Sequence, residues 1–290
     1  MNRSVIALAA IALALAPGLS ACNKKSAEAA PARPLIGATP AGLSFDGAGG
    51  DAAAMRAHGE RLSHVLGCRG CHQENLEGAW FNEDTPDMGK LYASNLTRVL
   101  PTMSDAQLRR LLRDGVHPTR GDLWVMPSKV FQRLSEADVN ALIAHLRTVK
   151  AAGAQTPPPA MSAKAKAMVA RGEEHPESYY VAQYKQLVPV DLGPRYALGR
   201  YLASNTCAEC HGPDLSGVPD FGKGVSTPNL TIAASYSDAE LTRLLTSGQG
   251  RTPRDLGLMS LVGKGHFAYF TPHERAAVVA YVKARAARLQ

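Results

Sequence analysis

The chain is poor in cysteine and in aromatic residues. Its 290 residues include five cysteines, and aromatic residues make up 6% of the total. Four cysteines form two Cys-x-x-Cys-His motifs, at 68–72 and 207–211, and the fifth is Cys22. No cysteine is therefore left over for a structural disulfide, which is the usual role of cysteine in small secreted proteins.

Long apolar runs are absent beyond the N-terminus. Residues 5–16 form one apolar stretch after Arg3, too short to span a bilayer as a mature helix but typical of a signal peptide. It ends in Leu19-Ser20-Ala21-Cys22, which resembles the lipobox of bacterial lipoproteins. The resemblance implies a signal peptide over residues 1–21, lipidation of Cys22 and anchoring at the periplasmic side of a bacterial membrane. The alternative is an ordinary cleavage after Ala21.

A strong excess of one charge is also missing. The formal net charge is +7, a basic balance that raises nucleic-acid binding as a hypothesis. Export argues against that hypothesis, so we predict no nucleic-acid partner.

Alternating apolar and polar residues, the pattern of a half-buried strand, are absent as well. The sequence instead repeats itself, which indicates two copies of one domain. Ser104 and Ser237 are separated by 133 positions, as are Met126 and Met259. The matched segments are 68–72 with 207–211, 95–97 (Asn-Leu-Thr) with 229–231, and 104–108 with 237–241.

Each copy has the pattern of a small helical domain. Amphipathic segments at 55–66 and 196–203 precede the two cysteine motifs, and a middle helix and a last helix follow. The helix signals are capping boxes at Ser104 and Ser237, stop glycines at Gly115 and Gly248, and last-helix starts at Ser135 and Thr271. We predict an all-α fold with a flexible tether (22–50), a first domain (51–150), a linker (151–192) and a second domain (193–290).

Cys-x-x-Cys-His is the attachment signature of c-type haem. The two thiols add to the two vinyl groups of the haem, and the adjoining histidine lies against the iron. We therefore predict two covalently bound haem c groups, held by Cys68, Cys71, Cys207 and Cys210, with His72 and His211 as proximal iron ligands. A thioredoxin-like pair would follow a strand, and a zinc site needs four ligands where one motif offers three.

Both repeats resemble the class I cytochrome c family, in which the haem motif comes first, a methionine ligand follows, and a last helix closes the domain. More narrowly, they resemble the cytochrome subunits of membrane-bound alcohol and sugar-acid dehydrogenases, which carry a similar Asn-Leu-Thr segment. The resemblance implies Met126 and Met259 as distal iron ligands. His117 and His266 are the main competitors for that role.

Six-coordinate iron leaves no open position for a substrate. We therefore predict an electron carrier rather than an enzyme, working with redox partners such as a dehydrogenase, a quinol-linked complex or a terminal oxidase. Two alternatives remain: a haem enzyme, such as a di-haem peroxidase or a thiol-oxidising cytochrome, and a gas-binding module. Both require an open or labile distal site.

Overall fold

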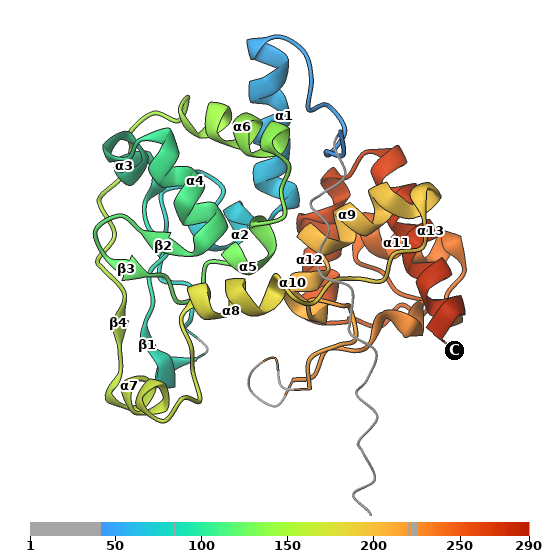
Figure 1. The fold of residues 1–290 in the computed structure, drawn as a ribbon. Helices are drawn as coiled ribbons and strands as arrows, with labels where there is room; N and C mark the ends of the chain where they lie inside the picture. Colours follow the sequence, from blue (N-terminus) through green and yellow to red (C-terminus); the bar gives the residue numbers. More distant parts are fainter. Residues whose placement is uncertain (1–41, 84, 220, 222–224, 290) are drawn as a thin grey trace, which may run out of the picture. The chain divides into compact units, whose positions relative to one another are not determined.

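The computed structural model describes residues 42–83, 85–219, 221 and 225–289 (Figure 1). The predicted signal peptide (1–21), Cys22 and the predicted tether up to residue 41 lie outside this part of the chain. Within the described part, no helix combines the length and the apolar character that crossing a membrane requires.

The first repeat is helical, as predicted. Its α-helices and short 3₁₀ helices (η) are α1 (Ala52–Val65), α2 (Cys68–His72), η1 (Pro86–Met88), α3 (Leu96–Val99), η2 (Leu100–Thr102), α4 (Asp105–Asp114), α5 (Ser128–Phe131) and α6 (Glu136–Leu146). The described strands are two residues long, too short to show the alternation of a sheet: β1 (Gly89–Lys90), β2 (Val116–His117), β3 (Gly121–Asp122) and β4 (Ala160–Met161). β1 pairs with β4 and β2 with β3, both antiparallel.

The second repeat follows the same order of helices, which confirms the all-α prediction. Its elements are η3 (Pro194–Tyr196), α9 (Ala197–Asn205), α10 (Ala208–His211), η4 (Leu230–Ser235), α11 (Asp238–Ser247), α12 (Leu258–Gly265), η5 (Phe267–Tyr269) and α13 (Pro272–Leu289). Buried apolar side chains of both repeats form one connected core.

The predicted ends of the middle helices, α4 and α11, are confirmed. Each begins with a complete capping box, in which the side chains of Ser104 or Ser237 and of the residue three positions later satisfy each other's backbone N–H groups. Each ends at a glycine with positive φ, +68° at Gly115 and +74° at Gly248. This left-handed conformation costs glycine little, so the chain can turn sharply there.

In each repeat the first helix crosses the last helix at very short range. A Cβ added at Gly59 in α1 would lie 1.9 Å from the Ala141 carbonyl oxygen in α6. A Cβ added at Gly199 in α9 would lie 2.1 Å from the Ala277 carbonyl oxygen in α13. Neither glycine has positive φ, so close backbone approach is what requires glycine at these two positions.

The predicted linker contains helices that pack on the first repeat, and the end of the predicted tether packs against the core. The linker contains α7 (Ala163–Ala170) and α8 (Glu177–Tyr184), and α8 packs on α5 and α4. Near the end of the predicted tether, Phe45 is only 1% exposed and belongs to the core. A single large aromatic residue in a stretch of small and polar residues does not indicate, from the sequence alone, that the stretch packs against the core.

Candidate functional site

The two Cys-x-x-Cys-His motifs occupy matching places, directly after the first helix of each repeat. The first forms α2, which follows α1 after a turn at Gly67 (φ 72°). The second forms α10, which follows α9. After each histidine the chain folds back in the same way, because Gly78 N donates to the His72 carbonyl and Gly217 N to the His211 carbonyl, both at 2.8 Å.

Both motif histidines are oriented through the same ring nitrogen. His72 Nδ1 lies 2.8 Å from the Ser94 carbonyl oxygen, and His211 Nδ1 lies 2.8 Å from the Pro228 carbonyl oxygen. A carbonyl can only accept, so Nδ1 carries the proton and Nε2 keeps a free lone pair. Burial lowers the pKa of both imidazoles, which favours the neutral form. A neutral imidazole with its second nitrogen fixed by a hydrogen bond is the usual state of a metal-ligating histidine.

The Asn-Leu-Thr segments hold the two carbonyls that orient these histidines. Asn95 Oδ1 accepts a hydrogen bond from Thr97 N, and Asn229 Oδ1 accepts one from Thr231 N, both at 3.0 Å. Each asparagine therefore caps the helical turn that follows it, directly after the residue whose carbonyl accepts from the motif histidine. The repeated segment fixes the position of the histidine ring.

The four motif thiols differ from the cysteines of redox enzymes. Burial raises the pKa of Cys68 and of Cys210 to about 12, and that of Cys207 to about 11. Reactive cysteines have lowered pKa values, since the thiolate is the nucleophile. In the described ranges, no group of three or more His, Cys, Asp or Glu side chains is placed to hold a metal ion.

The predicted distal ligands, Met126 and Met259, are both partly buried and pack against the core. Their local structures differ because of the residue that follows each. Pro127 disfavours helical backbone at Met126, so α5 begins only after it, at Ser128. Ser260 imposes no such restriction, and Met259 lies in the first turn of α12.

Large apolar side chains beside both methionines are unusually exposed. Val125 is 44% exposed, Leu258 51% and Leu261 56%. A porphyrin buries a wide apolar surface, so exposed aliphatic groups next to a thioether suit its presence. The oriented imidazoles, the paired thiols and the partly buried methionines are the kinds of side chain that haem c requires, and each repeat contains them.

The structure gives each of the two competing histidines other contacts. His117 Nδ1 accepts hydrogen bonds from Thr119 N at 3.2 Å and Arg120 N at 3.3 Å. The proton is therefore on Nε2, the opposite arrangement from His72. His266 faces the first motif, because a Cβ added at Gly67 would lie 2.9 Å from its Cε1 and one at Gly70 3.3 Å from its Nε2. No pattern in the sequence indicates this contact between the repeats.

The charge of a residue in the second motif affects a thiol of the first. Burial, and after it the charge of Glu209, raises the pKa of Cys71. Burial also raises the pKa of Glu209, against the opposing charge of Lys129 in α5. Lys129 Nζ lies 3.9 Å from Glu177, whose pKa burial raises to about 7. The carboxyls of Glu209 and Glu177 and the ammonium of Lys129 therefore form a charged group beside the two motifs.

Comparison with known proteins identifies the repeats. The family model described as "Cytochrome c" matches residues 57–150 and 196–286. No curated protein matches the chain. Among solved structures, a chain of the reducing HAO-like protein complex of Kuenenia stuttgartiensis is similar at 18% identity. The alignment covers 78% of this chain and 95% of that one, with a TM-score of 0.22, which is too low to establish a common fold.

Proposed function

Because the chain belongs to the cytochrome c family and matches it twice, we propose that it is a di-haem electron carrier. One haem c would be attached in each repeat, through Cys68 and Cys71 and through Cys207 and Cys210. The observation that carries this proposal is the matched pair of imidazoles, each with Nδ1 hydrogen-bonded to a carbonyl and Nε2 available.

The protein's own groups set the properties of each site. His72 and His211 would ligate iron on one side, and Met126 and Met259 on the other. Thioether sulfur stabilises reduced iron, so this ligand pair raises the reduction potential and suits a carrier that accepts electrons from a dehydrogenase or a quinol-linked donor. The bound haem supplies the one-electron chemistry, and the rigid helices limit rearrangement of its ligands.

Transfer between the two haems is supported by contacts that each motif makes with residues outside its own repeat. His266 of the second repeat packs on Gly67 and Gly70 of the first motif. Tyr184 at the end of α8 donates a hydrogen bond to the Ala208 carbonyl of the second motif, at 3.4 Å. We therefore propose that an electron enters at one haem, moves to the other within the chain and leaves to an acceptor.

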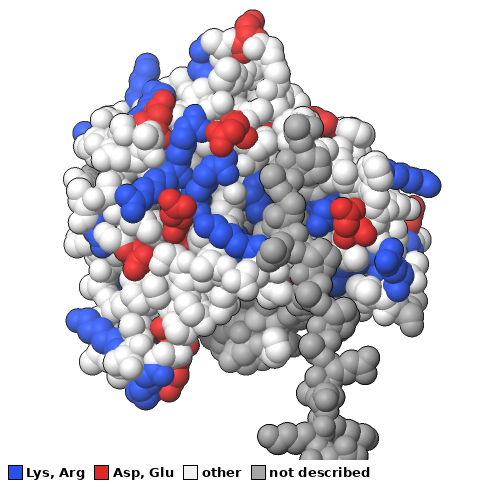
Figure 2. Space-filling model, in the orientation of Figure 1, with Lys and Arg blue, Asp and Glu red and all other residues white. Residues whose placement is uncertain are grey.

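Location and partners follow from the sequence. A lipid on Cys22 would hold the protein at the periplasmic side of a bacterial membrane, where its partners would be membrane-associated or periplasmic redox proteins. The surface in Figure 2 carries intermixed basic and acidic side chains. Ion pairs such as Arg109 with Glu136, at 2.9 Å, and Arg147 with Asp105, at 2.8 Å, neutralise part of this charge.

Optical spectroscopy of the purified protein tests the proposal directly. We expect two low-spin haems per chain, a near-infrared methionine-to-iron band in the ferric state, and no change on adding carbon monoxide to the ferrous state. A high-spin haem, or ready carbon monoxide binding, would contradict the electron-carrier proposal. Peroxide turnover would then support the di-haem peroxidase.

His266→Ala tests the placement of this residue beside the first motif. We expect the second haem to keep its methionine band, and the potential of the first haem to shift, because the variant exposes its motif to water. Potentiometric titration followed in the visible and near-infrared measures both. His175→Ala is the control, since His175 stacks on Tyr179, at 3.8 Å between ring centroids, and His266 is the histidine that lies against Gly67 and Gly70. Loss of the second methionine band in His266→Ala would show that the placement is wrong.

A further inference from the structure

Two carboxylates occupy equivalent positions at the start of the last helix of each repeat. Asp138 is the third residue after the Ser135 cap of α6, and Glu274 is the third residue after Thr271 at the start of α13. Capping carboxylates are normally solvent-exposed, but both of these are 0% exposed. A buried carboxylate needs several hydrogen-bond donors. The residues that supply these donors show which segments of the chain meet at each carboxylate.

Each carboxylate receives a donor from the other repeat. The Tyr201 hydroxyl, from α9 of the second repeat, donates to Asp138 at 2.5 Å. The Arg61 guanidinium, from α1 of the first repeat, donates to Glu274 at 2.7 and 2.9 Å. The two links run in opposite directions across the interface, so they connect the repeats reciprocally.

The segment 43–47, which we call the clamp, supplies a further donor to each carboxylate. Phe45 N donates to Asp138 at 3.1 Å, and the next residue's N–H, that of Asp46, donates to Glu274 at 2.8 Å. The clamp thereby contacts the last helix of the first repeat and the last helix of the second. The two helices do not need the clamp for capping, because the side chains of Ser135 and Thr271 already cap them.

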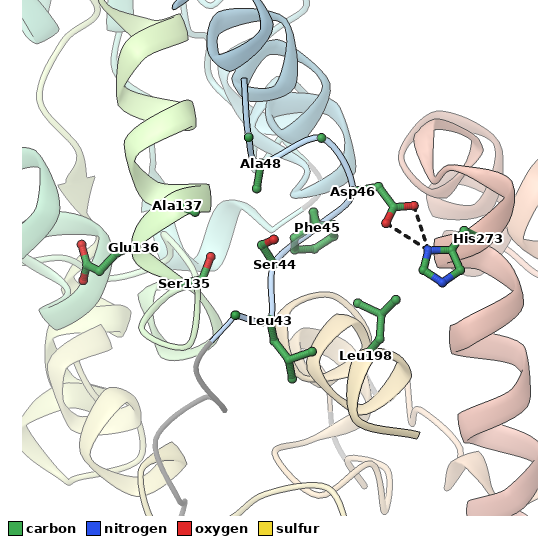
Figure 3. A pocket seen from close by; sticks show the side chains of 13 residues that line it. Leu43, Ser44, Phe45, Asp46, Ala48, Ser135, Glu136, Ala137, Leu198 and His273 are labelled. Atoms are coloured by element: carbon green, nitrogen blue, oxygen red, sulfur yellow. Dashed lines mark hydrogen bonds and ion pairs between the residues drawn. The ribbon is translucent and has the colours of Figure 1, made fainter. Parts of the chain in front are cut away.

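Side chains of the clamp make further contacts with both repeats, and Figure 3 shows one of them, between Asp46 and His273. The Phe45 ring contacts Tyr201 edge-on at 5.7 Å and stacks with Phe270 at 6.4 Å between centroids. The Asp46 carboxylate accepts from the Thr271 hydroxyl and lies 3.0 Å from His273 Nδ1. A 1% exposed aromatic ring and a paired carboxylate fix this short segment between the repeats.

We propose that the clamp is a positioning element that fixes the two haem domains relative to each other and so sets the rate of electron exchange between them. This rests on the proposed di-haem function. The rate of electron transfer between two centres falls steeply as the distance between them grows. A flexible connection between the repeats would therefore give a range of distances and a range of transfer rates. Tyr201 and Arg61 join the repeats directly by short hydrogen bonds. The clamp binds the same two carboxylates and so keeps these hydrogen bonds from breaking.

The test compares full-length holoprotein with the variant Phe45→Ala. Pulsed electron paramagnetic resonance of the ferric protein measures the distance between the two low-spin haems. Pulse radiolysis measures how fast an added electron equilibrates between them. We expect one narrow distance and single-exponential exchange in the wild type. Phe45→Ala should lose the narrow distance and exchange more slowly, with unchanged optical spectra of each haem.

Two further variants keep the test decisive. Phe45→Leu retains an apolar side chain and should restore much of the narrow distance. Leu108→Ala truncates a residue of the first repeat's core that is 4% exposed, and it should destabilise the protein without broadening the distance. A distance and rate in Phe45→Ala equal to the wild type would overturn the clamp. A wild type without two low-spin haems would instead overturn the proposed function, so the two failures are distinguishable.

If Phe45→Ala loses haem, calorimetry of wild type and Asp46→Ala, which removes the carboxylate that contacts Thr271 and His273, decides the question. A clamp that couples the repeats predicts one cooperative unfolding transition in the wild type. It also predicts a broader or divided transition in the variant, since the repeats then unfold more independently. Identical single transitions would contradict the proposal.

Discussion

Met126→Ala and Met259→Ala are each expected to abolish the near-infrared methionine band of one haem and leave that of the other. Loss of the thioether opens the distal position, so the affected haem should become high-spin and bind carbon monoxide. Its reduction potential should fall by a few tenths of a volt, within the roughly 0.8 V that axial ligands span. Optical spectra with and without carbon monoxide, and a potentiometric titration, measure these changes.

Met103→Ala is the matched control for this prediction. Met103 is 8% exposed and belongs to the core of the first repeat, without a methionine counterpart in the second. Its truncation should lower stability by about 2 kcal/mol or more, as for other buried methionines, while both bands remain. A first haem that lacks the methionine band in the wild type, stays low-spin in Met126→Ala and becomes high-spin in His117→Ala would assign the distal role to His117 instead.

Gly59→Ala and Gly199→Ala are expected to destabilise the protein strongly. The added methyl groups would lie 1.9 Å and 2.1 Å from carbonyl oxygens of the crossing helices. Backbone cannot move aside as a flexible side chain can, so the helices must separate. We expect a loss of at least about 3 kcal/mol in the free energy of unfolding, at or above the upper end of overpacking effects. Denaturant unfolding followed by circular dichroism measures it.

Gly265→Ala is the control for these two substitutions. Gly265 also lies in a helix, at the end of α12, but a Cβ there would meet nothing within 4 Å. That change should be neutral or slightly stabilising, because alanine restricts the unfolded chain more than glycine does. Equal unfolding midpoints for Gly59→Ala and Gly265→Ala would show that the helices are not as close as the structure places them.

The haem motifs and the helix boundaries could be predicted from the sequence because their interactions are local. The Ser104 capping box joins residues three apart, and the stop at Gly115 needs only the backbone freedom of glycine. The Cys-x-x-Cys-His motif likewise carries its thiols and its imidazole within five residues. Such signals survive in the sequence without knowledge of the fold.

The distal ligands could be predicted from the sequence only in part. The repeat offset favoured Met126 and Met259, but a sequence could not exclude His117 or His266. The structure adds the hydrogen bonds to His117 Nδ1 and the packing of His266 on Gly67. The first depends on a local turn, and the second joins residues nearly two hundred positions apart, where the sequence carries no pairing signal.

The sequence by itself determined the chemistry and the repeat: the thiols, the imidazoles, the matched methionines and two all-α domains. Only the tertiary structure decided how the repeats meet. Phe45 and Asp138 are 93 positions apart, and Asp46 and Glu274 are 228 apart. No local pattern joins such residues, because their contact depends on the packing of whole helices that bury charge and aromatic surface together. The contacts of the clamp, the glycine crossings and the contact of His266 with the first motif are therefore properties of the folded chain.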